Sequence, residues 1–372
     1  MPLCDVLIIG SGMAGAGAAY ELSDGGRVLL LEREDTHGYH TTGRSAALYI
    51  ETYGNAVIRG LTRASRPDFE APAPGFAAAP LLTPRGVLHI ARADQLAALQ
   101  ALAAAGGEAV ALLGPEPAVA MFPRLRASYV AQGLYEAAAM DIDVNALHQG
   151  FLRGARARGA EVRTGCDVVA IGRQGHAWRV TCASGEAFEA EVVVNAAGAW
   201  ADRIAAMAGA RPLGLQPMRR TAVVFEAPAG VDLRGAPAVI DVDEQFYFKP
   251  EAGRILASPA DETPCEPCDA WADEMDVAVC IDRVQAAADL PVRRVLRSWA
   301  GLRSFVADRS PAIGFDAELA GFFWLAGQGG YGVQTAPAAA RAAAALARRR
   351  ELPADLQAQG VTAADLSPGR LR

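Results

Sequence analysis

The sequence DVLIIGSGMAGAGAAYEL at residues 5–22 contains the pattern on which the fold prediction depends. Residues 5–9 form an almost wholly apolar run, which is typical of a buried parallel strand. Glycines follow at positions 10, 12 and 15 in the spacing G-x-G-x-x-G, and an alanine-rich helix is expected up to Ser23. A strand, a glycine turn and a helix in this order indicate a Rossmann unit that binds a dinucleotide.

Each glycine of this turn has its own expected role. Gly10 permits the tight turn, Gly12 lets the backbone approach a pyrophosphate, and Gly15 allows the helix to pack closely on the strand. Met13 and Ala14 open the helix, whose N-terminus stabilises the negative charge of the phosphates. All five residues are therefore predicted cofactor contacts.

The acidic residue that such a site requires is also present. Glu32 ends the second apolar strand, 27–31, and lies 22 positions after Gly10. A carboxylate at this place accepts hydrogen bonds from ribose hydroxyls and repels a 2′-phosphate, so the pattern disfavours NADP. Glu32 and the adjacent Arg33 are both predicted to contact the cofactor.

Three further segments favour FAD over NAD. The donors of residues 40–47 are expected to clasp a pyrophosphate and the flavin edge. The strand 192–194 runs into small residues, and the strand 321–326 ends in a glycine turn whose N–H groups can stabilise negative charge on a reduced flavin. Non-covalently bound FAD is therefore predicted, with these contacts: Thr42, Gly43, Arg44, Ser45, Ala46, Ala47, Val168, Ala197, Gly198, Trp200, Gly301, Gly329, Gly330, Tyr331, Gly332 and Gln334.

The order of the elements predicts two discontinuous domains. Both ends of the chain have Rossmann-like patterns, whereas short successive strands between residues 214 and 258 indicate a separate antiparallel sheet. The expected fold class is α/β: a Rossmann-like FAD-binding domain with an inserted, mostly antiparallel β-sheet substrate domain. The predicted divisions are 1–80, 141–213 and 300–372 for FAD, and 81–140 and 214–299 for the substrate.

Composition excludes several classes of protein. The 372 residues have a net charge of -7, which argues against a nucleic-acid binder. We find no signal peptide and no apolar run of about 20 residues, so a cytoplasmic protein without a transmembrane segment is expected, as a monomer or homodimer. Cys265 and Cys268 form a C-x-x-C pair without a second ligand pair nearby, and no metal site is predicted.

At this point the sequence resembles a known family. It is similar to the D-amino acid oxidase/glycine oxidase superfamily of flavoproteins, and within it to the bacterial FAD-dependent D-arginine/D-amino acid dehydrogenases. The similarity extends over nearly the whole chain. The segments that carry it are GYHTTGRSAA at 38–47, DID at 141–143, LHQG at 147–150, NAAGAW at 195–200, PLGLQP at 212–217, WAGLRSF at 299–305 and GGYG at 329–332.

The resemblance implies oxidative deamination of a D-amino acid. Hydride leaves the α-carbon for flavin N5, and the resulting imino acid hydrolyses to a 2-oxo acid and ammonia. Arg220 and Arg303 match the arginines that bind the substrate carboxylate, a role suited to a planar guanidinium. Tyr53 and Tyr247 match the tyrosines that cover or hydrogen-bond the substrate. Gly330 and Gln334 match positions near the substrate amine and the flavin.

Three positions depart from the relatives that prefer arginine. Val87 stands where those relatives have a glutamate, Leu48 where they have a histidine, and Ile50 where they have a threonine. All three changes make the substrate pocket less polar, and an unpaired guanidinium buried there would be costly. The sequence therefore predicts a preference for neutral or hydrophobic D-amino acids.

The electron acceptor and the reaction type leave alternatives. Related oxidases often use a lysine near the flavin, and the single lysine, Lys249, does not match that position; a dehydrogenase with a quinone or another electron acceptor is therefore favoured. Oxidation of glycine or sarcosine-type secondary amines and of 2-hydroxy acids are the alternatives. A non-catalytic FAD-binding redox module is the alternative from another class.

Overall fold

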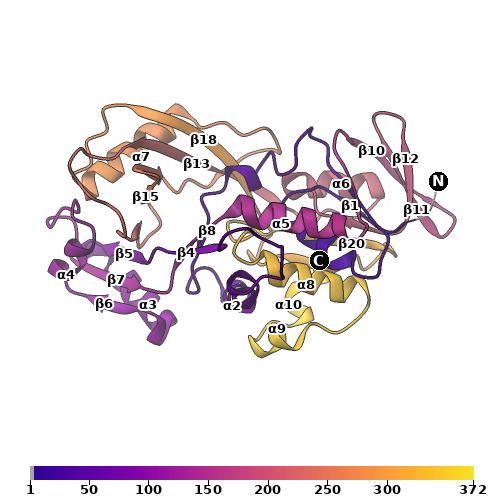
Figure 1. Cartoon of the computed structure of the whole chain (residues 1–372), viewed down its shortest axis with the longest axis horizontal. Helices are drawn as coiled ribbons and strands as arrows, with labels where there is room; N and C mark the ends of the chain where they lie inside the picture. The colour runs from indigo at the N-terminus through magenta and orange to yellow at the C-terminus, as the bar shows by residue number, and fades with distance from the viewer. Residues whose placement is uncertain (1–3) are drawn as a thin grey trace.

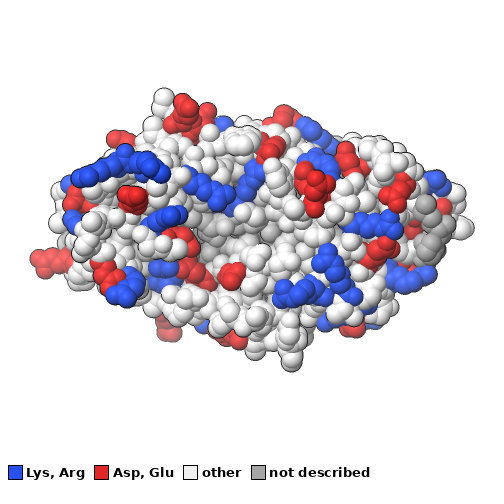
Figure 2. Space-filling view, turned by 45° about the horizontal axis from the view of Figure 1, so that its top comes forward, with Lys and Arg blue, Asp and Glu red and all other residues white. Residues whose placement is uncertain are grey.

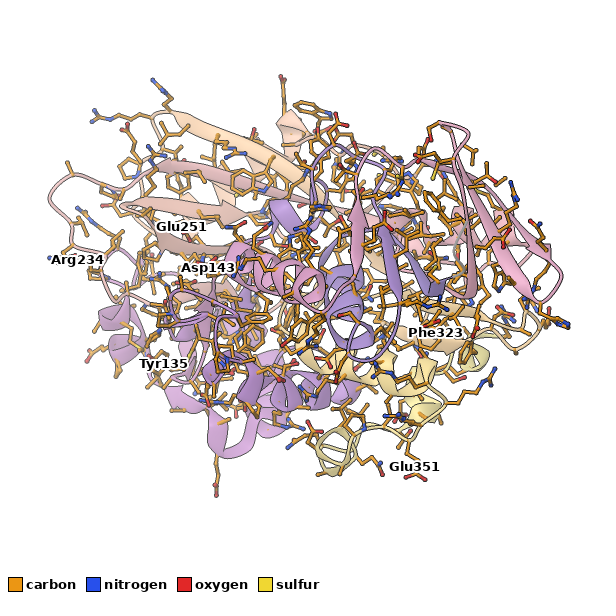
Figure 3. All side chains as sticks on the ribbon, turned by 45° about the vertical axis from the view of Figure 1, so that its right-hand side comes forward. Tyr135, Asp143, Arg234, Glu251, Phe323 and Glu351 are labelled. Carbon is orange, nitrogen blue, oxygen red and sulfur yellow. The ribbon has the colours of Figure 1, made fainter. Side chains whose placement is uncertain are left out.

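The computed structural model describes residues 4–372 and contains three β-sheets. An eight-stranded sheet and a nine-stranded sheet lie toward opposite ends of the elongated molecule, with α5, α2 and α8 between them in this view (Figure 1). Phe323 lies at the end of the eight-stranded sheet, whereas Tyr135 and Glu251 lie at the other end (Figure 3). The predicted α/β fold with an additional antiparallel sheet is confirmed.

The eight-stranded sheet has a parallel centre. Its order is β10-β11-β12-β1-β2-β9, with β20 beside β12 and β19 beside β20. β1 pairs in parallel with β2 and β12, and β12 with β20. The strands are β1 (Cys4–Ile9), β2 (Val28–Leu31), β9 (Glu161–Arg163), β10 (Val168–Gln174), β11 (Ala177–Cys182), β12 (Ala187–Asn195), β19 (Ala312–Phe315) and β20 (Phe322–Ala326).

Helices cover both faces of this sheet, which explains its apolar strands. Ile8 belongs to one core cluster, packed under α1, α5 and α8, whereas Leu7 and Ile9 belong to the other, on the side of α6. Adjacent residues of a strand face opposite sides, so both faces of β1 are buried. These helices are α1 (Met13–Leu22), α5 (Val144–Ala157), α6 (Ala201–Ala208) and α8 (Ala336–Ala347).

The nine-stranded sheet is mostly antiparallel. Its order is β17-β13-β16-β15-β14-β5-β7-β6, with β18 beside β13, and only the β14–β5 pairing within it is parallel. Its strands are β5 (Val87–Ala91), β6 (Ala111–Leu113), β7 (Gln132–Glu136), β13 (Gln216–Glu226), β14 (Ala238–Asp241), β15 (Tyr247–Glu251), β16 (Arg254–Ser258), β17 (Thr263–Pro264) and β18 (Val295–Phe305). A hydrophobic core cluster packs on one face of this sheet. It includes Phe122, which is the residue after α4, and Val284 of α7.

A three-stranded sheet joins segments that are distant in sequence, in the order β3-β8-β4. It consists of β3 (Leu48–Tyr49), β4 (Leu82–Pro84) and β8 (Met140–Ile142). The remaining helices are α2 (Ala56–Glu70), α3 (Leu96–Gly106), α4 (Pro115–Met121), α7 (Glu274–Ala287), α9 (Ala354–Ala358) and α10 (Ala363–Leu366). Short 3-10 turns occur at η1 (Thr42–Arg44), η2 (Ala93–Gln95), η3 (Gly107–Ala109), η4 (Gly198–Trp200) and η5 (Pro368–Leu371).

The strands of the two large sheets come from alternating parts of the chain. The eight-stranded sheet uses residues 4–31, 161–195 and 312–326, and the nine-stranded sheet uses 87–136, 216–264 and 295–305. The predicted boundary between residues 299 and 300 falls inside β18, which is continuous from 295 to 305. We propose the two sheets, with the helices packed on them, as the cores of a cofactor domain and a substrate domain.

The surface has charges of both signs. On the face shown in Figure 2, arginine and lysine side chains are interspersed with aspartate and glutamate around a hollow near the centre. Within residues 4–372, no helix combines the length and the apolar character that crossing a membrane requires.

Candidate functional site

A cavity of about 800 Å³ is lined by residues of both large sheets. Most of the predicted site residues meet in its wall. Those that line it are Gly10, Gly12, Met13, Ala14, Glu32, Arg33, Thr42, Arg44, Ser45, Ala46, Ala47, Leu48, Ile50, Tyr53, Val168, Ala197, Gly198, Trp200, Arg220, Tyr247, Gly301, Arg303, Gly329, Gly330, Gly332 and Gln334. The predicted residues outside this lining are Gly15, Gly43, Val87 and Tyr331.

The glycine turn between β1 and α1 is set by close packing. Gly10 has φ +99°, and a Cβ there would lie 2.5 Å from the carbonyl oxygen of Ala196. A Cβ on Gly15 would lie 1.8 Å from the carbonyl oxygen of Gly10. Since both obstacles are backbone atoms, neither position has room for a side chain. Gly15 therefore acts through packing of helix on strand and does not itself line the cavity.

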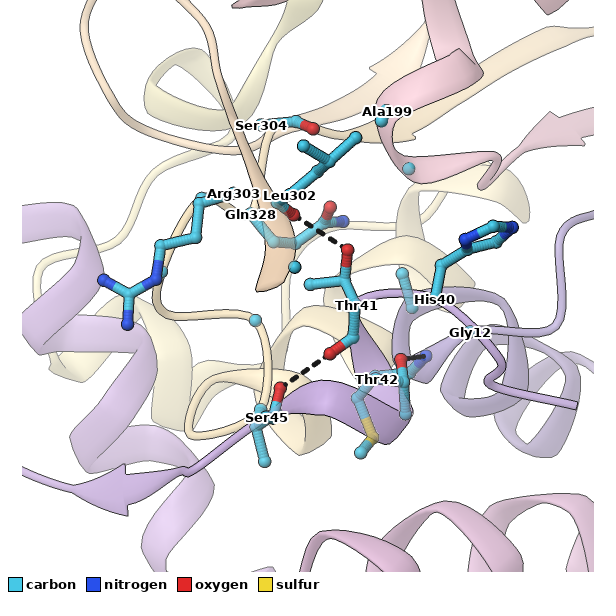
Figure 4. A pocket seen from close by; sticks show the side chains of 18 of the residues that line it. Gly12, His40, Thr41, Thr42, Ser45, Ala199, Leu302, Arg303, Ser304 and Gln328 are labelled. Carbon is cyan, nitrogen blue, oxygen red and sulfur yellow. Dashed lines mark hydrogen bonds between the residues drawn. The ribbon is translucent and has the colours of Figure 1, made fainter. Parts of the chain in front are cut away.

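The N-terminus of α1 faces the cavity and is joined to the segment before β3. The hydroxyl oxygen of Thr42 accepts a hydrogen bond from the Met13 amide at 2.9 Å (Figure 4). A Cβ on Gly12 would meet only this hydroxyl, at 3.3 Å. The first turn of a helix has N–H groups without intrahelical partners, so this place suits a phosphate.

Glu32 is held in the cavity wall at the end of β2. Its Oε2 accepts hydrogen bonds from the Ser11 amide at 2.9 Å and the Ser11 hydroxyl at 2.7 Å, and its Oε1 accepts one from the Glu34 amide at 3.1 Å. Each carboxylate oxygen can accept further bonds, which fits the ribose of a dinucleotide.

The segment at residues 41–45 connects the glycine turn to β18. The Thr41 hydroxyl donates to the Leu302 carbonyl at 2.8 Å, and the Ser45 hydroxyl donates to the Thr41 carbonyl at 2.9 Å (Figure 4). Trp299 Nε1 donates to the Arg44 carbonyl at 2.9 Å. Contacts with β18 therefore fix the position of this segment relative to the nine-stranded sheet.

Arg44 lines the cavity, but its guanidinium is engaged elsewhere. It donates to the carbonyls of Ala270, at 2.8 Å, and Ala300, at 3.1 Å, and pairs with the Asp269 carboxylate. Arg33 pairs with Glu34 at 2.6 Å and lies over the Trp200 ring, 4.5 Å from its centroid. Neither guanidinium is free of protein partners, so a phosphate bound in this region would meet mainly backbone N–H groups.

The glycine turn after β20 lies against the candidate substrate arginine. A Cβ on Gly330 would lie 2.7 Å from Nη1 of Arg303, and one on Gly329 would lie 2.1 Å from the Phe305 ring. The sequence reasoning assigned Gly330 and Arg303 to one site, and the structure brings them into contact. Tyr331, turned away from the cavity, packs on Phe305 and Ile58.

The two candidate carboxylate-binding arginines have different surroundings. Arg220 donates from Nε to the Asp261 carbonyl at 2.8 Å and from Nη2 to Glu262 at 3.3 Å. Arg303 forms no ion pair within residues 4–372, and its one side-chain partner is the Tyr53 hydroxyl, 3.5 Å away. Of these two arginines, Arg303 is therefore the one that is available to an anionic ligand.

Tyrosines surround this free guanidinium. Burial raises the pKa of Tyr53 to about 12, although the nearby Arg303 lowers it, so the phenol stays protonated. Burial lowers the pKa of Arg303, but Tyr53 and Tyr247 raise it, and the net shift is upward. A permanent positive charge beside two phenols can bind one carboxylate.

Gln334 has its amide engaged with neighbouring segments. Its Oε1 accepts from the Ile50 amide at 3.3 Å, and its Nε2 donates to the Thr62 hydroxyl at 2.8 Å. These bonds connect the start of α8 to the residue after β3 and to α2. The side chain thus supports the cavity wall at Ile50.

The three apolar substitutions are not equivalent in the structure. Leu48 and Ile50 line the cavity, whereas Val87 is fully buried and packs behind it with Ile50 and Ala238. The residue of β5 that reaches the cavity is His89, two positions further along the same strand face. Sequence reasoning missed His89 because a single histidine in an apolar strand is usually a core residue.

Two further lining residues, His40 and Gln328, lie in segments that the sequence assigned to the cofactor without giving either residue a role of its own. His40 stacks on Trp200 with ring centroids 4.6 Å apart, and both its Nδ1 and the Nε2 of Gln328 are buried without a hydrogen-bond partner. Buried polar atoms are normally bonded, so two such atoms in a cavity wall fit a polar ligand such as FAD.

The buried imidazole of His89 predicts a pH dependence of stability. Burial lowers its pKa from 6.5 to about 4. Between those two pH values, the unfolded chain therefore binds a proton that the folded chain does not. The part of the unfolding free energy that depends on a neutral His89 is present in full above pH 6.5 and is lost as pH falls toward 4. We expect His89→Leu to reduce the loss of unfolding free energy over this range by about 3 kcal/mol. Urea denaturation of both proteins at pH 7 and pH 4.5 measures this difference. An equal loss of unfolding free energy in the unmodified protein and in His89→Leu would contradict the prediction.

The C-x-x-C pair lies outside the cavity. The sulfurs of Cys265 and Cys268 are 3.6 Å apart, and all six cysteines are free thiols. Within residues 4–372, no group of three or more histidine, cysteine, aspartate or glutamate side chains is arranged to hold a metal ion.

The chain is similar to known proteins both in sequence and in fold. The chain is 25% identical to glycine oxidase of Geobacillus kaustophilus over 367 residues, covering 95% of each protein. A crystal structure of glycine oxidase from that organism superimposes with a TM-score of 0.82 at 24% identity, covering 94% of this chain and 96% of that one. An FAD-bound L-α-glycerophosphate oxidase of Mycoplasma pneumoniae has a TM-score of 0.84 at 21% identity, covering 94% and 95% of the two chains.

Human mitochondrial sarcosine dehydrogenase is 26% identical over 343 residues, which cover 86% of this chain and 37% of that protein. The profile of the DAO family, described as FAD dependent oxidoreductase, matches residues 5–346. This match spans both large sheets and every segment of the cavity wall described above. The chain therefore belongs to the DAO family of FAD-dependent oxidoreductases.

Proposed function

We propose that the chain catalyses FAD-dependent oxidative deamination of D-amino acids with neutral or hydrophobic side chains. The observation that carries the proposal is Arg303, an arginine without an acidic partner, which faces the cavity beside Tyr53 and against Gly330. A partly buried cation of this kind favours binding of an anion, and the carboxylate of an amino acid supplies one. The preference for the D-enantiomer follows from the family resemblance.

The residues near Arg303 would position the substrate. Arg303 would bind the carboxylate in a bidentate manner, with Tyr53 and Tyr247 covering the bound acid. Arg220, held by Asp261 and Glu262, would supply a second positive charge. Because these groups come from separate strands and one loop, the sheet fixes the α-carbon relative to the glycine turn 327–332.

FAD supplies the hydride acceptor when it is bound. Gly12, Thr42 and the N-terminus of α1 would hold its pyrophosphate, Glu32 its ribose, and the glycine turns at 198 and 329–330 would lie beside its rings. The substrate loses an α-hydrogen as hydride and an amine proton, and the imino acid reacts with water to give a 2-oxo acid and ammonia. A quinone or another acceptor would then take the electrons.

A second candidate is oxidation of glycine or a sarcosine-type secondary amine. The similarity to glycine oxidase and to sarcosine dehydrogenase favours it as much as it favours D-amino acids. The carboxylate-binding site would be the same, and only the group at the α-carbon or nitrogen would differ. A non-catalytic FAD-binding module would have the cofactor site without this arrangement of Arg303 and tyrosines.

A substrate panel tests the proposal under anaerobic conditions. Neutral D-amino acids are expected to abolish the oxidised flavin absorbance rapidly, with D-arginine slower by about 100-fold, because Leu48 and Ile50 make this part of the lining apolar and leave a guanidinium there unpaired. L-amino acids, sarcosine, glycine and 2-hydroxy acids complete the panel. The highest kcat/KM with D-arginine would contradict the predicted specificity. Bound FAD that none of the acids reduces would support the binding module instead.

A further inference from the structure

The nine-stranded sheet brings three cavity residues into one row across adjacent strands. His89 of β5 lies opposite Ile240 of β14, and Ile240 lies opposite Tyr247 of β15. Directly opposite residues point to the same face of a sheet, and all three line the cavity. Neighbouring strands are about 4.8 Å apart, so the Cα atoms of His89 and Tyr247 are separated by about 10 Å.

This row extends from the candidate carboxylate site toward the far wall of the cavity. Tyr247 is near Arg303, whose pKa it raises. If the carboxylate is bound there, a substrate side chain of three or four heavy atoms that points along the row passes Ile240 and comes within reach of His89. His89 is therefore placed to contact the end of the side chain, not the reacting α-carbon.

The wall around His89 is otherwise apolar. Leu102, Ile240 and Val242 also line the cavity and belong to the core clusters on either side of His89. Thr52 is a further polar lining residue, but its hydroxyl donates to Glu136. Polar groups with an existing partner have less need of a ligand.

The imidazole has no such partner. The His89 side chain is 8% exposed, and its Nε2 is buried without a hydrogen bond. Burial alone lowers its pKa, with no charged or hydrogen-bonding group contributing, so the ring is neutral at pH 7. A neutral imidazole has one donor and one acceptor, and histidine χ2 turns broadly, so the ring can direct either nitrogen to the cavity.

Two glutamates bear on whether this wall could bind a cationic side chain. Glu244, which lines the cavity between β14 and β15, raises the pKa of Arg303 and so acts on the candidate carboxylate site. Glu136, opposite Val87 on β7, is buried and accepts hydrogen bonds from the Thr52 hydroxyl and from the Glu51 amide at 2.9 Å. Leaving a buried donor or acceptor unpaired costs free energy, so an uncharged group that pairs with His89 is favoured over an apolar one.

We propose that His89 is a specificity-determining residue that selects amino acids whose side chain has an apolar stem and ends in one uncharged hydrogen-bonding group. This inference rests on the proposed function and narrows its substrate class. It assigns to His89 a contact with the substrate side chain and no part in hydride transfer.

Matched substrates test the inference with the FAD-loaded enzyme. D-Glutamine and D-methionine have similar length, and only the first ends in a hydrogen-bonding group. Anaerobic stopped-flow measurement of flavin reduction gives the ratio of the reduction rate constant to the dissociation constant for each. The unmodified enzyme is expected to use D-glutamine at least as efficiently as D-methionine, and a preference of more than about tenfold for D-methionine would overturn the inference.

Variants separate the hydrogen bond from the shape of the pocket. His89→Leu is expected to lower this ratio for D-glutamine by about 10-fold or more and to change it less than about threefold for D-methionine. His89→Gln keeps a hydrogen-bonding group and is expected to restore most of the use of D-glutamine. Ile240→Val, the control, alters the same row but keeps the imidazole, and should affect both substrates alike.

The results distinguish failure of the inference from failure of the proposed function. Equal effects of His89→Leu on both substrates would overturn the role of His89 while leaving D-amino acid oxidation in place. No reduction of bound FAD by any amino acid would overturn both. The FAD content of each purified variant is first measured from its flavin absorbance. The comparison of D-glutamine with D-methionine in the unmodified enzyme tests the inference even if a variant fails to fold.

Discussion

Arg303→Met is expected to lower kcat/KM for the best D-amino acid by about 100-fold or more. Arg303 has no acidic partner within residues 4–372, so the substrate carboxylate would be its principal counter-ion. Removing one partner of a buried, hydrogen-bonded charge pair costs about 2–5 kcal/mol, and each 1.4 kcal/mol is about tenfold in affinity. Steady-state kinetics with an artificial electron acceptor measures the effect.

Two observations distinguish a binding role of Arg303 from a structural one. A carboxylate inhibitor that shifts the flavin spectrum of the unmodified enzyme should bind the Arg303→Met variant at least about 100-fold more weakly, while FAD content stays near one per chain. Arg297→Met, an exposed arginine on the same strand, is the matched control and should leave both unchanged. Unaltered inhibitor affinity in Arg303→Met would remove Arg303 from the substrate site.

Gly15→Ala is expected to abolish FAD binding and to destabilise the chain by about 3 kcal/mol or more. The added Cβ would lie 1.8 Å from the Gly10 carbonyl oxygen, and this obstacle is backbone rather than a mobile side chain. Relief of the overlap requires α1 to move away from β1, which displaces the helix N-terminus from the pyrophosphate site. Flavin absorbance per chain and thermal unfolding of the purified protein measure the two effects.

Two other glycines serve as comparisons for Gly15. A Cβ on Gly172 of β10 would have nothing within 4 Å, so Gly172→Ala should retain both FAD and stability. Gly12→Ala would meet only the Thr42 hydroxyl at 3.3 Å, and should keep the fold while weakening FAD binding. If Gly15→Ala bound FAD normally, the assignment of the glycine turn to cofactor binding through helix–strand packing would be wrong.

Local patterns were sufficient to predict the parts of the protein that depend on neighbouring residues. The apolar run before Gly10 is β1, and the helix expected after the glycine turn is α1, which begins at Met13 and ends at Leu22. Glu32 occupies the end of β2, where the spacing placed it. Turn geometry and strand periodicity are set within a few residues, so the sequence contains them directly.

The roles of individual arginines could not be predicted in the same way. Arg44 stands in a segment expected to clasp FAD, yet its guanidinium pairs with Asp269, which is 225 residues further along the chain. The positions of the acidic residues decide which guanidinium forms an ion pair, and of the two candidate carboxylate-binding arginines Arg303 has none within residues 4–372. The motif alone did not distinguish Arg303 from Arg220, which has Glu262 beside it.

The sequence by itself determined the FAD-binding Rossmann unit, the family and the presence of a second, antiparallel sheet. Only the tertiary structure decided which residues of that sheet face the cavity, because strand order and register join residues far apart in the chain. His89 and Tyr247 are in one row through β14, although Tyr247 lies 247 − 89 = 158 positions after His89 in the chain. Val87 lies behind the cavity wall and His89 lines it, since contacts with Ile50 and Ala238 cover Val87 and leave His89 open to the cavity.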